Sequence, residues 1–176
     1  MSRLAETILS VAQSLPEGRL LSPKEFLHLA SRTSIDQTLM RLTRQGKLLR
    51  VGRGSYAVPV HGRFGTRSPS TQAVLKAIKA SGEVVVSNGA AAANTLGLTT
   101  QTPIREVFLT SGRPRILHLG NRTVEIKLGE SWQLALGNQP AGLAIRALSW
   151  LGPEQAPAAL EVLRRKLPPS ESLPLS

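Results

Sequence analysis

The sequence predicts an α+β fold with two domains. Its 176 residues suffice for two small domains, and hydrophobic residues make up 41% of the chain, which is enough to build a core. Apolar residues recur at helical spacing in residues 3–15 and 33–45. Residues 48–58 and 104–128, in contrast, contain short segments typical of strands, separated by turns that contain glycine.

The helix expected at residues 33–45 is amphipathic. Thr33 or Ser34 can cap its start, Gly46 follows its end, and Asp36 is expected in the first turn, where the helix dipole favours a negative charge. At about 100° per residue, one face is apolar and the opposite face is polar and basic. The apolar face comprises Ile35, Leu39 and Leu42, and the opposite face comprises Gln37, Arg41 and Arg44.

A β-hairpin is expected directly after this helix. Residues 48–51 and 55–58 have strand character and flank the segment Gly52-Arg53-Gly54. This connection places Arg53 at the tip of the hairpin, with Arg50 on the preceding strand.

The residues before the helix complete a recognisable order of elements. Residues 3–15 predict a helix, and residues 19–21 a short third strand beside the hairpin. Ser22, Pro23 and Glu25 form a capping-box pattern that opens a short helix to about residue 30, with Phe26, Leu27 and Leu29 offered to the core. Helix, strand, helix, turn, helix and hairpin within about 60 residues is the order of a winged helix-turn-helix domain, which we predict for residues 1–60.

The rest of the chain predicts a linker, a second domain and a tail. Residues 61–70 are rich in Gly, Ser and Arg and predict a linker. Residues 71–167 predict a mixed α/β domain, and residues 168–176 a flexible tail. Trp132 and Trp150 are expected in the core of this domain, with an interface anchor as the alternative for either. The helices of the α/β domain are expected at 71–81, 89–96 (capped by Ser87), 132–136, 140–151 and 153–167. Its strands are expected at 83–86, 104–110, 115–119 and 123–128.

Charge favours a polyanionic partner. The formal net charge is +11, and residues 1–67 hold 11 Lys and Arg against 4 Asp and Glu. No apolar run is long enough for a membrane span, so nucleic acid is the better candidate. There is no cysteine, the three histidines are far apart, and the N-terminus lacks the features of a secretory signal. We therefore expect no metal, no cofactor and a cytoplasmic location.

The basic residues of the first domain predict contacts with double-stranded DNA. An α-helix fits the major groove, where glutamine pairs with adenine and arginine with guanine, so Gln37 and Arg41 are expected at base edges. Arg44, Lys47, Arg50 and Arg53 are expected at phosphates or in the minor groove. Arg63 and Arg67 can reach DNA as an arm, or lie in a solvated linker. The alternative for all eight of these residues is an ordinary basic surface in contact with solvent.

Two segments resemble a known family. The run RLTRQGKLLRVGRGSYAVP (residues 41–59) and the run AAAANTLGLTTQTPIREVFLTSG (residues 90–112) together resemble the AbiEi-like antitoxins of type IV toxin–antitoxin systems, which act in abortive infection. The resemblance implies a bacterial winged-helix repressor of its own promoter. It also implies a C-terminal domain that neutralises a nucleotidyltransferase-like toxin encoded alongside. The chain is shorter at its C-terminus than the longer members of that family.

Two other functions stay open at this point. The winged helix can be a scaffold within a protein-interaction module, because a fold does not fix a function. A small metal-dependent nuclease using Glu106, Glu125 and Lys127, with Glu130 nearby, is the weaker alternative. No nucleophile–base signature and no glycine-rich phosphate loop occurs, so we predict no enzymatic activity and no catalytic residues.

Overall fold

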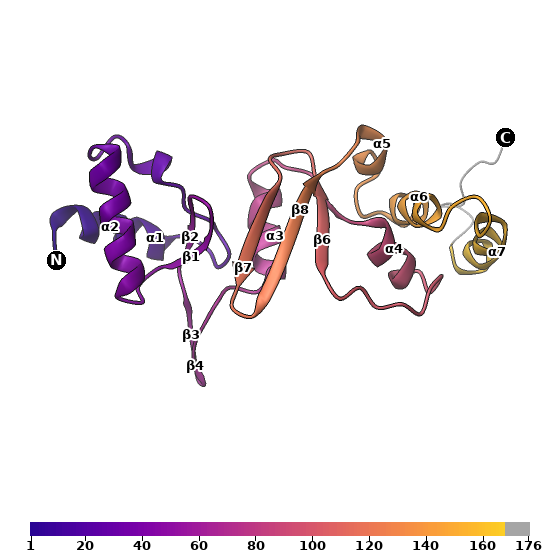
Figure 1. Cartoon of the computed structure of the whole chain (residues 1–176), viewed down its shortest axis with the longest axis horizontal. Coiled ribbons are helices and arrows are strands. Elements are labelled where there is room, and N and C mark those ends of the chain that lie inside the picture. The colour runs from indigo at the N-terminus through magenta and orange to yellow at the C-terminus, as the bar shows by residue number, and fades with distance from the viewer. Residues whose placement is uncertain (168–176) are drawn as a thin grey trace. The chain divides into compact units, whose positions relative to one another are not determined.

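The computed structural model describes residues 1–167 and confirms the α+β class. The contacts within the chain divide it into two compact units. Unit 1 comprises residues 1–82 and 116–124, and unit 2 comprises residues 83–115 together with the residues from 125 onward. Figure 1 labels helices and strands of both units. The predicted tail, residues 168–176, lies outside the described residues.

Unit 1 begins with two helices near the predicted positions, α1 (Arg3–Ser14) and α2 (Arg32–Arg44). Helix α2 starts earlier than predicted, because the Ser31 hydroxyl accepts the backbone N–H of Ser34 and caps the helix. Thr33 and Ser34 therefore lie inside it. Asp36 falls beyond the first turn, and its carboxylate instead accepts from Arg32 Nε at 2.9 Å, an i,i+4 pair.

The segment between α1 and α2 forms a shorter helix than predicted. The capping box of Ser22 and Glu25 is present, but it opens a 3-10 helix, η1, that spans only Pro23–Phe26. Phe26 is buried, whereas Leu27 and Leu29 are exposed, contrary to the prediction that they reach the core. Without a continuous apolar face, nothing extends the helix beyond its first turn.

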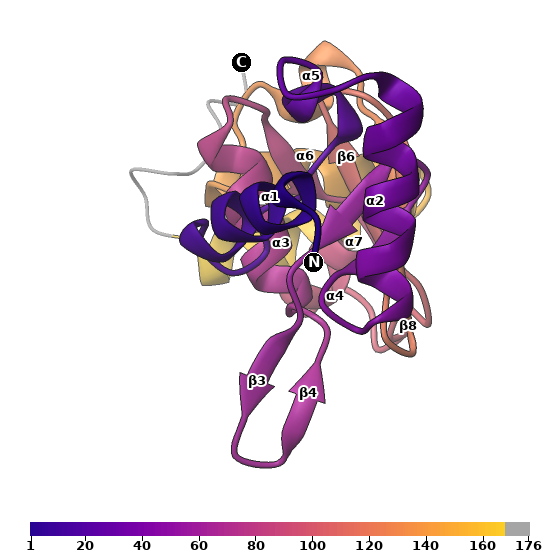
Figure 2. The same cartoon turned by 90° about the vertical axis from the view of Figure 1, so that its left-hand side faces the viewer.

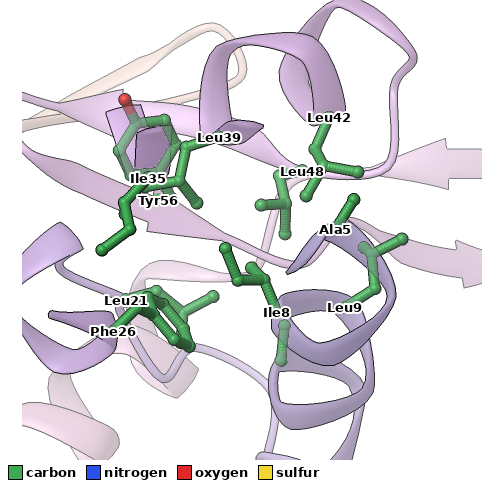
Figure 3. Packing of buried hydrophobic residues seen from close by; sticks show 11 residues of the cluster. Ala5, Ile8, Leu9, Leu21, Phe26, Ile35, Leu39, Leu42, Leu48 and Tyr56 are labelled. Carbon is green, nitrogen blue, oxygen red and sulfur yellow. The ribbon is translucent and has the colours of Figure 1, made fainter. Parts of the chain in front are cut away.

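Eleven buried residues from α1, η1, α2, the strand that contains Tyr56 and the segments between these elements form one core (Figure 3). As predicted, α2 contributes its apolar face, Ile35, Leu39 and Leu42, each at most 1% exposed. The other members are Ala5, Ile8, Leu9, Ala12, Leu21, Phe26, Leu48 and Tyr56. This packing fixes which face of α2 turns outward.

The predicted hairpin forms from β1 (Leu49–Gly52) and β2 (Ser55–Ala57), joined by Arg53 and Gly54. Leu21 pairs with Tyr56 as the short third strand, through Leu21 N–H to Tyr56 O at 2.7 Å and Tyr56 N–H to Leu21 O at 2.9 Å. The tip of this hairpin lies close to strand β7 (Arg115–Leu119), which the sequence did not indicate. A Cβ on Gly52 would lie 2.9 Å from Ile116 O.

A second hairpin replaces the irregular linker expected at residues 61–70. Strands β3 (Val60–Gly62) and β4 (Gly65–Arg67) pair in antiparallel register, with Arg63 and Phe64 as the two turn residues. Gly65 supplies the positive φ, +112°, that follows the turn. Figure 2 shows this hairpin projecting from unit 1 at the end where α2 finishes. Helix α3 (Thr71–Ala80), capped by Ser70, follows.

The remaining strands form a four-stranded mixed sheet in the order β5-β6-β8-β7. Strand β7 and residues 122–124 of β8 belong to unit 1, and the other strands to unit 2. The bounds are β5 Val85–Ser87, β6 Glu106–Thr110, β7 Arg115–Leu119 and β8 Arg122–Leu128. Each lies within two residues of its predicted bounds, but the pairing order depends on contacts that local sequence does not encode.

Four helices complete unit 2: α4 (Gly89–Thr95), α5 (Ser131–Leu134), α6 (Pro140–Leu151) and α7 (Ala156–Lys166). Asn88, not Ser87, caps α4. Helices α4 and α6 pack closely through small residues, and a Cβ on Gly89 would lie 2.6 Å from Trp150 Cβ. Trp132 and Trp150 are 44% and 45% exposed, so the prediction that both lie in the core is wrong.

Arg146 of α6 is 2% exposed and links the elements of unit 2. Its Nη1 donates to Gln133 O at 2.9 Å and Gly137 O at 2.8 Å, and its Nη2 donates to Asn138 Oδ1 at 3.3 Å. Asn138 in turn contacts strand β5, through Nδ2 to Val85 O at 3.4 Å. Burial lowers the pKa of Arg146. These bonds tie α6 to α5 and to the turn that follows it.

Candidate nucleic-acid interface

Unit 1 holds all eight residues predicted to contact DNA, and all eight are exposed. They lie on α2, the turn that follows it, the β1–β2 hairpin and the β3–β4 hairpin. The residues are Gln37, Arg41, Arg44, Lys47, Arg50, Arg53, Arg63 and Arg67.

The outward face of α2 carries a polar and basic surface. Gln37, Arg41 and Arg44 lie opposite the buried apolar face, as the helical period requires. The guanidinium of Arg41 is positioned by a short chain of hydrogen bonds. Its Nη2 donates to Thr38 Oγ1 at 3.2 Å, and that hydroxyl donates to Ser34 O at 2.8 Å. Thr38 is only 1% exposed, so the anchor is fixed while the other guanidinium donors stay free for a ligand.

Met40 lies beside these residues and is 49% exposed. Sequence reasoning missed it, although the same 100° spacing that places Gln37 outward also places Met40 there. An apolar side chain among polar ones on a groove-binding helix can contact the methyl group of thymine. Met40 therefore adds an apolar contact to a face that otherwise offers only hydrogen bonds.

Lys47, Arg50 and Arg53 continue the basic surface from the end of α2 to the tip of the first hairpin. The Nζ atom of Lys47 lies 3.8 Å from the sulfur of Met1, a weak contact that leaves its charge uncompensated. Arg53 occupies the two-residue turn between β1 and β2. The backbone of that hairpin is held by the core through Val51 and Tyr56, which are 1% and 8% exposed.

The second hairpin presents Arg63 and Phe64 at its turn. Phe64 is 99% exposed, and the Arg63 guanidinium lies 6.0 Å from the centre of its ring. Arg67 lies at the base of the hairpin, where its Nη1 donates to Glu17 Oε1 at 3.1 Å. Sequence reasoning named both arginines but missed Phe64, because the segment was interpreted as a linker.

Glu17 fastens the base of this second hairpin. Besides Arg67, its Oε1 accepts the backbone N–H of Ser70 at 3.2 Å, immediately before α3. The Ser70 N–H, and after it the Arg67 guanidinium, lowers the pKa of Glu17. The β3–β4 hairpin therefore projects from a base that is fixed within unit 1.

The charge distribution over these elements is one-sided. Between residues 37 and 67 the chain contains seven lysines and arginines and neither aspartate nor glutamate. Among residues 1–167, only Arg67 of these seven takes part in a salt bridge. A row of cations without acidic partners is the electrostatic signature of a surface for phosphates.

The residues of the nuclease alternative offer little support for metal chemistry. Lys127 Nζ lies 3.6 Å from Glu125 Oε1, so these two form an ion pair on one strand. Within residues 1–167, no group of three or more His, Asp or Glu side chains is placed to hold a metal ion.

Over the same residues, no helix combines the length and the apolar character that crossing a bilayer requires.

Comparison with known families places the chain in one of them. Residues 7–166 match the family described as Family of unknown function (DUF6088), and the chain belongs to that family. Neither a curated protein nor a protein of known structure matched the chain.

Proposed function

We propose that this member of the family binds double-stranded DNA in a sequence-specific manner, with unit 1 acting as a winged helix-turn-helix module. The observation that carries the proposal is the run from residue 37 to residue 67, with seven cations and no acidic residue on α2 and the two hairpins. In this assignment α2 enters the major groove. Gln37 and Arg41 read base edges, while Arg44, Lys47, Arg50 and Arg53 bind phosphates or enter the minor groove.

The resemblance to AbiEi-like antitoxins extends the proposal to biological role. We infer that the DNA is the protein's own promoter and that the protein represses it. We also infer that the protein acts as the antitoxin to a nucleotidyltransferase-like toxin encoded beside it. Expression of the neighbouring gene alone should arrest growth, and co-expression of this chain should restore it. Growth arrest that this chain fails to relieve would contradict the antitoxin role and leave DNA binding intact.

Salt-titrated binding to the upstream region and to a scrambled duplex tests the DNA proposal. We expect at least about a hundredfold preference for the upstream region at physiological salt, since specific sites exceed non-specific ones by roughly 10³ or more. Equal, weak and steeply salt-dependent binding to both duplexes would mean that the +11 charge provides only a sequence-independent attraction to polyanions.

Arg41→Ala sharpens the same assay. It should cost roughly 1–3 kcal/mol on the upstream region and much less on scrambled DNA, because a base contact rather than a phosphate contact is lost. Arg164→Ala is the matched control, since Arg164 is an exposed arginine of α7 in unit 2. Equal losses on both duplexes would contradict the base-reading role of Arg41.

A protein-interaction module is the second candidate, and one observation favours it. Trp132 and Trp150 of unit 2 are 44% and 45% exposed. Contiguous exposed apolar patches are typical of partner surfaces, and these two indole rings are candidates for such a patch. Salt-insensitive binding to a protein, with no binding to DNA, would establish this candidate in place of the first.

A further inference from the structure

The position of Phe64 gives its ring no part in the packing of unit 1. It occupies the turn of the β3–β4 hairpin and is 99% exposed, and the guanidinium of its neighbour Arg63 lies 6.0 Å from the centre of its ring. An aromatic ring is among the most effective groups for filling a core, so a ring held wholly in water at a projecting tip is unusual.

The hairpin that carries Phe64 has no apolar face of its own. Every residue of β4 is exposed, and of β3 only Val60, at the base, is half-buried. Its outer part is tied by its own ladder and by His61 Nδ1 and Thr66 Oγ1 at 3.0 Å. Its base is fastened to Glu17 through Arg67. Figure 2 shows the tip well clear of the rest of unit 1. The hairpin therefore holds Arg63 and Phe64 out from a fixed base.

We infer that Phe64 is a wedge that enters the minor groove of DNA and unstacks one base step, with Arg63 beside it in the groove. The inference rests on the proposed DNA binding and adds a deformation of the duplex to it. Architectural proteins insert single apolar side chains between base steps in this way and kink the duplex. Arginine is favoured in a narrow minor groove by the strong negative potential there.

Charge complementarity selects DNA as the occupant. The tip follows directly on a stretch with seven cations and no acidic residue, and Arg63 itself has no acidic partner within residues 1–167. A polyanion with flat apolar faces inside its charged backbone satisfies both Arg63 and Phe64 at once. An apolar protein groove would satisfy Phe64 but would desolvate the surrounding cations.

The position of the hairpin suits this role. In Figures 1 and 2, which share the vertical axis, it projects from unit 1 in the direction in which α2 runs, beyond the end of α2. In known complexes an arm beside a helix in the major groove reaches the adjacent minor groove, and in the proposed complex the hairpin occupies such a place. The two contacts then differ in kind: α2 reads bases, and the hairpin reads how readily a step unstacks.

The test measures affinity and bending in the same complex. A duplex of the upstream region carries a donor and an acceptor dye at its two ends, so that bending raises energy transfer, and anisotropy gives the dissociation constant. The proteins are the full chain, Phe64→Ala, Phe64→Leu and Ile104→Ala. Ile104 is the matched control because it is an equally exposed apolar residue in unit 2.

We expect the wild-type chain and Ile104→Ala to bend the duplex equally. Phe64→Ala should lose most of the bend and roughly tenfold in affinity, as base–aromatic stacking contacts do on truncation. It should keep most of the wild-type preference for the upstream region over scrambled DNA, because α2 still reads the bases. Phe64→Leu should keep part of the bend, since leucine also serves as a wedge. Permanganate oxidation of an unstacked thymine should appear with wild type and disappear with Phe64→Ala.

Each contrary result has a distinct meaning. Specific binding by the wild type to an unbent duplex, or a bend unchanged in Phe64→Ala, would overturn the wedge while leaving the proposed function in place. No binding of the wild type to the upstream region would overturn both. Unchanged thermal unfolding of Phe64→Ala is expected, because the ring contacts nothing in the core, and it excludes misfolding as the cause of a lost bend.

Discussion

The hairpins β1–β2 and β3–β4 follow one another in the chain and share one plan, yet they are held in different ways. Each is antiparallel, and each has an arginine at the first position of a two-residue turn, Arg53 and Arg63. The first has Tyr56 in the core and Leu21 as a third strand. The second has two solvated faces and depends on its ladder and on the ion pair at its base.

The difference separates residues that stabilise unit 1 from residues that, in the proposed function, bind a ligand. A two-stranded hairpin without a buried face is marginally stable by itself, so the β3–β4 hairpin contributes little to the folding free energy of unit 1. Its turn instead exposes a cation and an aromatic ring, Arg63 and Phe64, to solvent. The β1–β2 hairpin combines both functions, since its strands pack inward while Arg53 points to solvent.

The largest contrast is expected between the two aromatic residues of these hairpins. Tyr56→Ala should destabilise the protein by about 3 kcal/mol, because it removes a core ring that is 8% exposed. Phe64→Ala should change the free energy of unfolding by less than about 0.5 kcal/mol. Denaturant unfolding at neutral pH measures both. A large loss for Phe64→Ala would show that the ring packs on the protein and not on a ligand.

A glycine in each hairpin gives the next contrast. A Cβ at Gly52 would lie 2.9 Å from Ile116 O and 3.3 Å from Leu117 Cδ2, whereas at Gly62 the nearest atom is Gly65 O at 3.8 Å. Gly52→Ala should therefore cost about 1–3 kcal/mol through overpacking. Gly62→Ala should stay within about 0.5 kcal/mol. Equal costs in denaturant unfolding would mean that β7 does not restrain the first hairpin.

These contacts also explain how far sequence reasoning reached. The β1–β2 hairpin was predictable because two strand-like segments flank the glycine-bounded connection Gly52-Arg53-Gly54, and α2 was predictable from Ile35, Leu39 and Leu42. The β3–β4 hairpin was missed because neither of its faces is buried, so no alternation marks it. The contact of Gly52 with β7 and the bond from Ser70 to Glu17 join residues more than 50 positions apart. Local patterns carry no record of such pairs.

The candidate DNA surface followed the same division. Charge and helical spacing predicted the exposed cations of α2, whereas Met40 needed a complete count around the helix and Phe64 needed the hairpin itself. The start of α2 was wrong by two or three residues because Ser31, Thr33 and Ser34 all carry a hydroxyl that can cap a helix. Only the path of the backbone decides which one does.

The tip arginines provide a smaller contrast, in binding rather than stability. If both arginines bind phosphates, Arg53→Ala and Arg63→Ala should each make the negative slope of log K against log salt shallower by about 0.9 on any duplex. If Arg63 enters the minor groove beside Phe64, its replacement should also reduce bending, which Arg53→Ala should leave unchanged. Salt-titrated anisotropy and end-to-end energy transfer distinguish these cases. Equal effects of the two variants on bending would remove the distinction between the hairpins.

The smallest effect concerns the base of the second hairpin and depends on pH. The pKa of Glu17 in the folded protein is lowered, chiefly by the Ser70 N–H and then by Arg67. A carboxylate with a lowered folded pKa contributes stability above its unfolded pKa, and this contribution is lost as pH falls through the folded value. Glu17→Gln should therefore be less stable than wild type near pH 7, and the difference should shrink in acid.

The size of this difference is limited by solvent, because the side chain of Glu17 is 37% exposed and water screens its pairing with Arg67. Glu154→Gln, which removes the same charge at an exposed position of unit 2, is the control against which the difference is measured. In an Arg67→Ala background part of the pH-dependent loss should persist, since the Ser70 N–H is the larger cause. A difference that vanishes completely in that background would mean that the ion pair, and not the backbone of α3, fastens the β3–β4 hairpin.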